Sequence, residues 1–383
     1  MNTNNAASLI APHPLRALLD SLREDTFFLI LAAGLIVLGI FKPGKIPSYP
    51  ALVDWPTIAA LTGLLLLTKG LETSGLMLRL GKKMVGLMAT ERATAVFLVL
   101  TAALLSTMLT NDVALFVVVP LTLGVCRITA MPATRLIIFE ALAVNAGSAL
   151  TPIGNPQNLF LWQLSKTPFA EFVWHMLPLV TILTLVLLAL TACVFSGRPV
   201  RVNGSDEKTA LDPVLLGVSL ILYVPFLVAA DMHQTGWALG VVLLVFLILR
   251  PRVLLQLDWG LLLVFVLMFI DLRLLADLSF IRDGMHGLGL ELPKHLYLAS
   301  IATSQIVSNV PAAIALAEYS DNWKIISYGV SVGGFGFMVG SLANLIALRM
   351  SGDRRAWIVF HAYAVPFLLI AAFIGYLLLF VWN

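Results

Sequence analysis

The sequence predicts an all-α polytopic membrane protein. Hydrophobic residues make up 60% of its 383 residues and charged residues only 12%, about half the charge of an ordinary soluble domain. Apolar runs of about 20 residues, long enough to span hydrocarbon as helices, recur along the chain. No alternating apolar–polar pattern indicates a β-barrel. We therefore expect about nine full spans with the lipid bilayer as partner. Nucleic acid is not expected, because the basic residues flank spans rather than forming a patch.

Basic residues orient these spans, since cytoplasmic loops carry an excess of Lys and Arg. With the N-terminus in the cytoplasm and the C-terminus outside, 17 of the 24 Lys and Arg residues face the cytoplasm. We expect a multi-pass protein of the bacterial inner membrane. The expected divisions are an N-terminal tail at 1–25, a first repeat at 26–196, a polar cytoplasmic linker at 197–212 and a second repeat at 213–383.

The first repeat and the second repeat each contain an apolar segment with polar residues at its centre, at 93–127 and 296–320. STMLTNDVAL and SQIVSNVPAA share the pattern S-x-x-x-[ST]-N. A breaker inside a lipid-facing helix would strand backbone groups, so such a tip must be buried in protein or wet. We predict two re-entrant helical hairpins. The matched pairs are Ser106 with Ser304, Thr110 with Ser308, and Asn111 with Asn309.

Each predicted hairpin is followed by a helix that is interrupted by Gly, Pro and amide residues, at 134–163 and 325–349. GSALTPIGNPQNL and GGFGFMVGSLANL share G-x6-G-[NS]-x-x-N-L. Under the expected topology the hairpins enter from opposite faces, which makes the chain an inverted repeat. Such repeats place binding sites where their broken helices meet. The matched pairs are Gly147 with Gly333, Gly154 with Gly340, Asn155 with Ser341, and Asn158 with Asn344.

The two hairpin tips and the two broken helices suit ligand binding, because a helix begins inside the membrane at each of these four places. Asn155 is a good N-cap and Pro156 suits the first helical position, and Ser341 repeats the cap. Free N–H groups at helix starts favour an anion, while carbonyls released before the breaks favour a cation such as sodium. We expect Na⁺ near Asn111 and Asn309, with Na⁺ or H⁺ as the coupling ion and no other cofactor. The predicted site comprises Ser106, Thr110, Asn111, Asp112, Thr151, Gly154, Asn155, Asn158, Ser304, Ser308, Asn309, Gly340, Ser341 and Asn344.

The segments TNDVALFVVVPLTLG, GNPQNL, SNV and GSLANL resemble the ion transporter superfamily. That group includes divalent anion/sodium symporters, arsenite efflux pumps, citrate transporter-like permeases and certain sodium/proton antiporters. The resemblance extends from about Ala51 to the C-terminus. It implies a scaffold and a transport domain, a homodimer and an elevator motion. It also implies tips that read Ser-Asn-Thr, in which Ser and Asn help bind sodium and Asn and Thr hold carboxylates.

This chain departs from that tip pattern. Its tips read Thr110-Asn111-Asp112 and Ser308-Asn309-Val310, so the carboxylate-binding Thr is missing from both. The Asn-Asp tip is closer to the arsenite-pump branch, which makes an oxyanion or metalloid substrate as plausible as a carboxylate. Asp112 is an ionisable group at a membrane-embedded tip and is functional by default. It would carry the coupling proton, neutralise sodium, or act only as a helix cap.

The other acidic residues in or near the predicted spans give weaker functional predictions. Glu140 is expected to pair with Arg135 near the interface, with a transport role as the alternative. Asp271, Arg273 and Asp277 end a long span and are expected to form interfacial salt bridges.

An enzyme is not expected, because HExxH and GxSxG are absent and the polar tips hold amides and hydroxyls. The sequence thus predicts a secondary active transporter of a small anion, oxyanion or metalloid. A cation/proton antiporter and a channel are the alternatives.

Overall fold

The computed structural model describes residues 22–23, 26–76, 79, 88–129, 131–199 and 210–382. Most of the predicted N-terminal tail and of the 197–212 linker therefore lies outside the described residues. Within them the fold is helical, and one isolated antiparallel bridge joins Thr90 and Pro199. The polytopic all-α class predicted from composition is confirmed.

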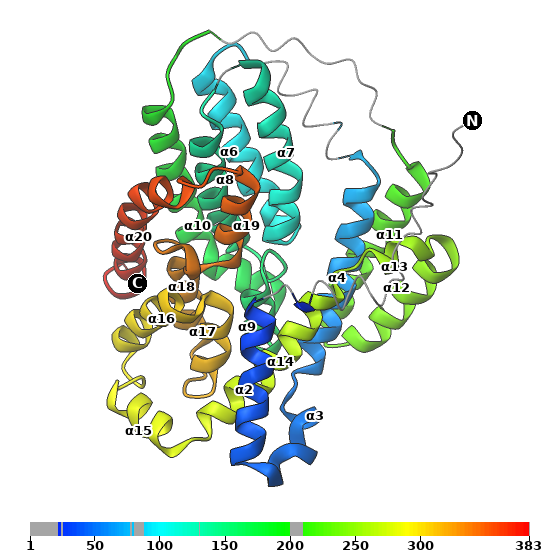
Figure 1. The fold of residues 1–383 in the computed structure, drawn as a ribbon, viewed down its shortest axis with the longest axis vertical. Coiled ribbons are helices and arrows are strands. Elements are labelled where there is room, and N and C mark those ends of the chain that lie inside the picture. The colour runs from blue at the N-terminus through cyan, green and yellow to red at the C-terminus, as the bar shows by residue number, and fades with distance from the viewer. Residues whose placement is uncertain are drawn as a thin grey trace, which may run out of the picture.

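The first half of the chain contains two interrupted helix pairs before its longest helix. The pairs are α6 with α7 and α8 with α9, and the 26-residue α10 follows them (Figure 1). The elements are α2 (Thr26–Phe41), η1 (Pro43–Ser48), α3 (Tyr49–Leu52), α4 (Trp55–Thr73), α6 (Glu91–Met108), α7 (Asn111–Thr129), α8 (Ala133–Ser148), α9 (Pro156–Ser165) and α10 (Phe169–Val194).

The second half repeats this order of two interrupted pairs and a final long helix. The elements are α11 (Pro213–Asp231), α12 (Thr235–Leu249), α13 (Pro251–Leu255), α14 (Trp259–Ala276), α15 (Ser279–Gly287), α16 (Pro293–Val307), α17 (Asn309–Ala317), α18 (Trp323–Gly333), η2 (Met338–Gly340), α19 (Leu342–Ser351) and α20 (Ala356–Phe380). The interruptions fall inside the predicted motifs, between α6 and α7, α8 and α9, α16 and α17, and α18 and α19.

Five of the described helices are long and apolar enough to cross a membrane: α6, α10, α11, α14 and α20. The pair Pro43–Leu52 and Trp55–Thr73, bent by 51°, makes six if it counts as one span. Shorter apolar helices include Phe28–Phe41 and Thr235–Leu249. By length alone the described residues thus supply five or six spans, and the expected nine stay a prediction.

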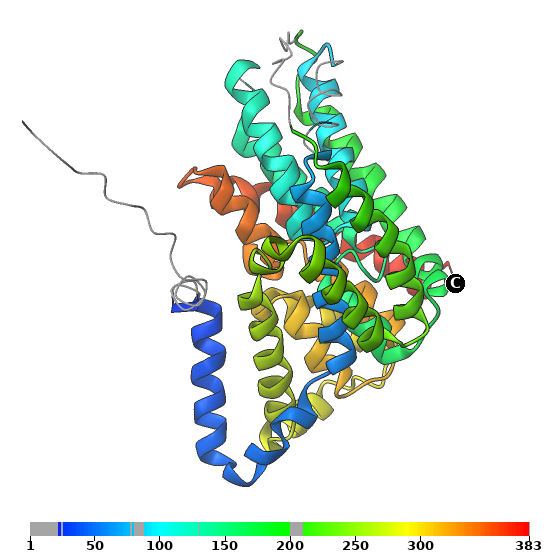
Figure 2. The ribbon, with the colours of Figure 1, turned by 90° about the vertical axis from the view of Figure 1, so that its right-hand side faces the viewer.

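The helices pack in two groups. Helices α2, α4, α11, α12 and α14 contact one another, and so do α6 to α10 with α16 to α20. Helix α2 lies at the edge of the molecule against α14 (Figure 2). The groups meet where α4 contacts α7 and α9, and where α14 contacts α17. The interrupted helices therefore share one body, and the second arms of the two predicted hairpins, α7 and α17, face the other body together with α9.

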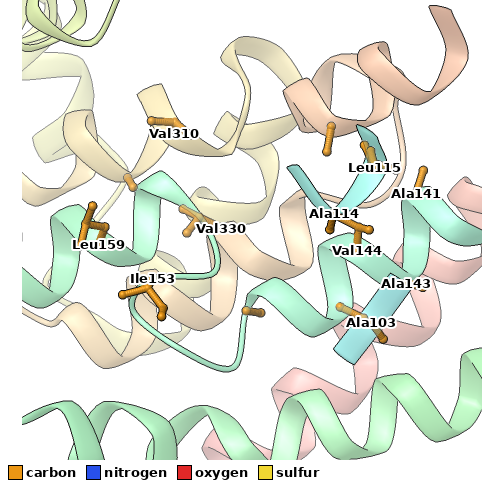
Figure 3. Close-up of a cluster of buried hydrophobic side chains, with 14 of the residues drawn as sticks. Ala103, Ala114, Leu115, Ala141, Ala143, Val144, Ile153, Leu159, Val310 and Val330 are labelled. Carbon is orange, nitrogen blue, oxygen red and sulfur yellow. The ribbon is translucent and has the colours of Figure 1, made fainter. Parts of the chain in front are cut away.

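The interrupted pairs of the two halves cross-pack inside their group. Helix α7 contacts α19, and α17 contacts α9, while α6 packs on α8 as α16 packs on α18. The core between them is built of small and β-branched side chains, among them Ala103, Ala114, Val144, Val310 and Val330 (Figure 3). Small residues let helix backbones approach closely. This close packing brings the four interruptions toward one region.

Candidate functional site

The first tip is fastened to the first broken helix by its backbone. Helix α6 ends at Met108, Leu109 is extended, and the Asn111 N–H donates to the Gly154 carbonyl at 3.0 Å. The side chains of Thr110 and Asn111 are buried, while Asp112 is half-buried in the first turn of α7. The tip therefore lies directly against the break between α8 and α9.

The first break is stabilised by hydrogen bonds from the side-chain amides of its own asparagines. Asn155 is the N-cap of α9, and its Oδ1 accepts from the Asn158 N–H at 2.9 Å, with Pro156 following as expected. The Asn155 amide also donates to the Ser148 carbonyl at 3.0 Å, and that of Asn158 donates to the Ala149 carbonyl at 3.0 Å. The predicted capping role of Asn155 is confirmed.

The second tip has a different geometry. Ser308 separates α16 from α17 with φ 77° and ψ 156°, a backbone region that is essentially restricted to glycine. Ser341 occupies the N-cap position of α19 with extended backbone. Neither serine makes a side-chain capping bond, so Ser341 holds the predicted cap position but not the capping bond. The Ser308 hydroxyl instead donates to Asn309 Oδ1 at 3.5 Å, and the buried Ser341 hydroxyl has no partner among the described residues.

Gln305, which the sequence analysis did not select, links the second tip to the second break. Its amide donates to the carbonyls of Gly333 at 2.6 Å and Phe335 at 3.0 Å. Its Oε1 accepts from the Phe337 N–H at 2.8 Å. The corresponding contact in the first half is smaller, because the Thr151 hydroxyl donates once, to the Thr107 carbonyl at 2.6 Å.

Ser106 and Ser304 pack against matched glycines. Their hydroxyls donate to carbonyls of their own helices, at Ala103 (2.8 Å) and Ser300 (2.7 Å). A Cβ on Gly147 would lie 2.6 Å from Ser106 Oγ, and one on Gly333 would lie 2.6 Å from Ser304 Oγ. These two serines therefore hold the hairpins close to the broken helices, and their hydroxyls are already bonded within the protein.

Asn145, which was not among the predicted site residues, connects the two halves. Its amide donates to Asn344 Oδ1 at 2.7 Å, and the Asn344 amide donates to the Gly334 carbonyl at 2.9 Å. A Cβ on Gly334 would lie 3.2 Å from Asn309 Nδ2. The second tip, the second break and the last turn of α8 thus meet around Gly334. A polar amide directly after the apolar run RLIIFEALAV was the available signal.

Around the tips and breaks, the asparagine side-chain nitrogens are hydrogen-bonded, whereas several side-chain oxygens have no partner. The amide groups of Asn145, Asn155, Asn158 and Asn344 all donate to protein acceptors. Within the described residues, seven buried oxygens at the tips and breaks have no hydrogen-bond partner. They are Thr110 Oγ1, Asn111 Oδ1, Asp112 Oδ1, Gln157 Oε1, Asn158 Oδ1, Ser331 Oγ and Ser341 Oγ. Unpaired buried polar atoms are costly, and such a set of oxygens can accept from a solute or coordinate a cation.

The other acidic residues lie outside this region, and two of them do not form the salt bridges that we expected. Asp271 is buried, with Oδ1 unpartnered and Oδ2 3.4 Å from where a Cβ on Gly34 of α2 would lie. The predicted interfacial salt bridge of Asp271 is therefore wrong, because Arg273 instead pairs with Glu318 at 2.9 Å. Asp277 does form one, with Lys45 at 3.2 Å. Glu140 accepts from the Thr122 hydroxyl rather than pairing with Arg135.

Two cavities open elsewhere. One of about 440 Å³ is lined by Asp277, Arg282, Glu291 and Glu318, among others. Another of about 280 Å³ lies beside Ser165, Asp321 and Trp323. Neither is lined by a residue of the predicted site. No group of three or more His, Cys, Asp or Glu side chains in the described part of the chain could hold a metal ion.

Interrupted, cross-packed helices with buried unpaired oxygens, in a chain this apolar, are typical of a polytopic membrane transporter. The citrate transporter family model (CitMHS) matches residues 16–325, and the chain belongs to that family. It is 49% identical to the inner membrane protein YbiR of Escherichia coli K12, over 94% of this chain and 97% of YbiR. It is 32% identical to the uncharacterized transporter MJ0456 of Methanocaldococcus jannaschii, over 87% and 92% of the two chains. A Dictyostelium discoideum protein that carries the name transporter arsB is 28% identical over 37% of this chain and 25% of its own.

Proposed function

We propose that this protein is a secondary active transporter that moves a small anion, oxyanion or metalloid across the inner membrane, coupled to Na⁺ or H⁺. The observation that carries the proposal is the meeting of two matched tips with two matched breaks. Backbone and amide contacts from Asn111 to Gly154 and from Asn145 to Asn344 join them, all in one body of helices.

We further propose an inverted repeat with nine full spans. Counting α8–α9 and α18–α19 as one crossing each, and adding α2, α4, α10, α11, α12, α14 and α20, gives nine when the hairpins α6–α7 and α16–α17 do not cross. The contacts of α10 support opposite entry of the hairpins. Beyond its end, the Arg198 carbonyl accepts from the Glu91 N–H at 3.0 Å, at the base of the first hairpin. In the first turn of α10, Glu171 pairs at 3.2 Å with Lys324, which lies just after the second hairpin.

The ligands are proposed from the chemistry of the breaks. Helices α9 and α19 start at the buried caps Asn155 and Ser341, and a helix start with free N–H groups favours an anion. The unpaired oxygens Thr110 Oγ1, Asn111 Oδ1 and Asp112 Oδ1 belong to three consecutive residues of the first tip, and oxygens of this kind suit a cation. We place the coupling ion there. The same oxygens favour a second candidate function, cation/proton antiport.

An elevator motion is proposed from the way the two bodies touch. Leu109 and Val113 of the first tip pack on Leu71, at the end of α4, together with Tyr223 of α11. The Tyr223 hydroxyl donates to the Met108 carbonyl. The two bodies also meet where α4 contacts α9, through the Phe160–Phe269 ring contact and through the Arg273–Glu318 ion pair, so these contacts must exchange as one body slides along the other. A homodimer is proposed on the resemblance alone.

Counterflow with purified protein in lipid vesicles tests the function. Vesicles loaded with unlabelled citrate, arsenite or phosphate should accumulate the matching labelled solute only if it is carried, and a sodium or pH gradient should alter the rate. Asn111→Ala and Asn309→Ala should abolish counterflow while each variant still elutes as a folded protein. Non-saturable flux would indicate a channel, and sodium–proton exchange without any anion would indicate the antiporter.

Asp112→Asn tests the coupling ion. Asparagine keeps nearly the shape of aspartate without the titrating charge, so this variant should fold and exchange solute without dependence on pH. Full proton-driven accumulation by Asp112→Asn would show that Asp112 does not carry the coupling proton, which would then bind elsewhere, as at Glu140.

A further inference from the structure

Glu140 is a buried acid that the proposed transport site does not use. It lies in the middle of α8 with no exposed surface. The hydroxyl of Thr122, on α7, donates to its Oε1, and Oε2 has no partner among the described residues. The expected partner Arg135 makes no ion pair with it and has an unpartnered Nε. Among the described side chains, Glu140 therefore has one hydrogen bond and no cation beside it.

Among the side chains that the structure describes, none on the helices that pack on α8 brings a counter-charge to Glu140. They are α6, α7, α10, α19 and α20. On α7, Cys126 lies one turn beyond Thr122 and close enough to sense the charge of Glu140. The remaining ionisable groups described on these helices are engaged elsewhere or exposed. Asp112 lies at the other end of α7, ten residues from Thr122. Glu91 accepts from Ser196, Arg92 donates to the Phe195 carbonyl, Glu171 pairs with Lys324, His175 contacts the Lys324 carbonyl, His361 bonds Trp357 and Met338, Tyr363 packs on Phe139, Tyr376 packs on Phe380, and Cys193 and Arg349 are exposed.

A carboxylate in such a place is costly without a partner ion. An isolated charge in a dry interior loses its hydration, and one hydroxyl does not replace it. The described side chains add no second carboxylate and no group of three ligands for a metal. A proton needs none of these, because it neutralises the acid by bonding to one oxygen. A buried carboxyl group with one hydroxyl partner therefore fits a proton.

We propose that Glu140 is a second proton-binding site, separate from the first tip. It ties α7 to α8, and both helices lead to the transport site. Helix α7 begins at Asn111, and Asn145 follows Glu140 by five residues, or about 7.5 Å along the helix. Gain and loss of this proton alter the α7–α8 contact that holds the first tip against its break. This consequence for transport rests on the proposed function, whereas proton binding itself does not.

Infrared difference spectroscopy of the full-length protein in phosphatidylcholine vesicles tests the site without a substrate, using H⁺ alone as the probe. A carboxylic acid C=O band should disappear reversibly as pH is raised. Glu140→Gln should lack that band, whereas Asp112→Asn and Asp271→Asn should retain it. Thr122→Val should keep the band at a higher frequency, because the carboxyl group has lost its only hydrogen bond.

Three results would overturn the proposal. The first is a band that Glu140→Gln leaves intact, and the second is a Glu140 band that stays unchanged up to the pH of unfolding, which would make the acid purely structural. The third is a band that sodium removes at constant pH, which would assign the site to a metal cation. If Glu140→Gln does not fold, the frequency in Thr122→Val decides, since an unshifted band cannot belong to Glu140.

Discussion

In the first half of the chain, a backbone hydrogen bond from Asn111 to Gly154 fastens the tip to its broken helix at 3.0 Å. In the second half the link is a side chain, Gln305, which makes three bonds to the break. The first tip has ordinary helical and extended backbone, while the second contains Ser308 with φ 77°. Matched sequence motifs thus give two differently built tips, a fixed first one and a second one that depends on a single side chain.

Gly154→Ala should have the largest effect on the fixed tip. A Cβ there would lie 2.3 Å from the Ser148 carbonyl oxygen and 2.7 Å from that of Ser106, both backbone atoms. We expect destabilisation at the upper end of the roughly 1–3 kcal/mol typical of overpacking, seen as a lower Tm in detergent. Gly124→Ala is the control, because nothing lies within 4 Å of that Cβ, and alanine in a helix should stabilise by about 0.5–1 kcal/mol. Equal Tm values for the two variants would show that the first break is loosely packed.

Gln305→Leu should loosen the second tip. It leaves the carbonyls of Gly333 and Phe335 and the Phe337 N–H without their partner, at about 1 kcal/mol or more each. Thr151→Val in the first half removes one bond and should cost about 1 kcal/mol. Hydrogen exchange should therefore accelerate at residues 304–309 in Gln305→Leu but stay slow at 106–112 in Thr151→Val. Similar acceleration at both tips would remove the distinction between them.

The shared features of the tips were predictable, and their differences were not. Asn155 followed by Pro156 indicates a helix start from sequence alone, because the residue preferences of the cap and the first turn are local. Gln305 and Asn145 read as ordinary polar residues of helices, since their partners Gly333 and Asn344 come from other segments. Asp271 was assigned to the interface because nothing in its own helix shows that it faces Gly34 of α2. Long-range packing decides such positions.

Ser308→Gly should produce a smaller change with the opposite sign. The backbone of Ser308 lies in a region that costs a non-glycine residue about 1–3 kcal/mol, so glycine should raise the Tm modestly after its own entropy cost. Ser308→Ala keeps the backbone cost and removes the hydroxyl, and should not raise the Tm. Thr110→Gly is the first-tip control. Thr110 is not among the described residues with positive φ, so this change should destabilise by roughly 0.5–1 kcal/mol. A higher Tm in Thr110→Gly would mean that both tips are strained.

The smallest effect is expected at the surface link between the two halves. Beyond the end of α19, Asp353 accepts from the Arg355 N–H at 2.8 Å and from the Thr134 hydroxyl, at the start of α8, at 3.0 Å. These bonds hold the pKa of Asp353 below its usual value, the backbone bond contributing most. A lowered pKa stabilises the fold above the unfolded-state value of about 3.9, and this contribution is lost as pH falls through the folded-state pKa.

Asp353→Asn keeps the turn but removes the charge, so its Tm should lie slightly below wild type at neutral pH. The difference should disappear in acid, because the wild-type carboxyl group is then protonated too. Thr134→Val removes only the lesser of the two bonds and should give a smaller gap with the same pH dependence. The Asn145–Asn344 link has no titratable group, so Asn145→Ala should lower the Tm equally at both pH values. If the Tm difference between wild type and Asp353→Asn does not depend on pH, the carboxylate charge adds nothing to the surface link. The buried amides alone would then join the halves.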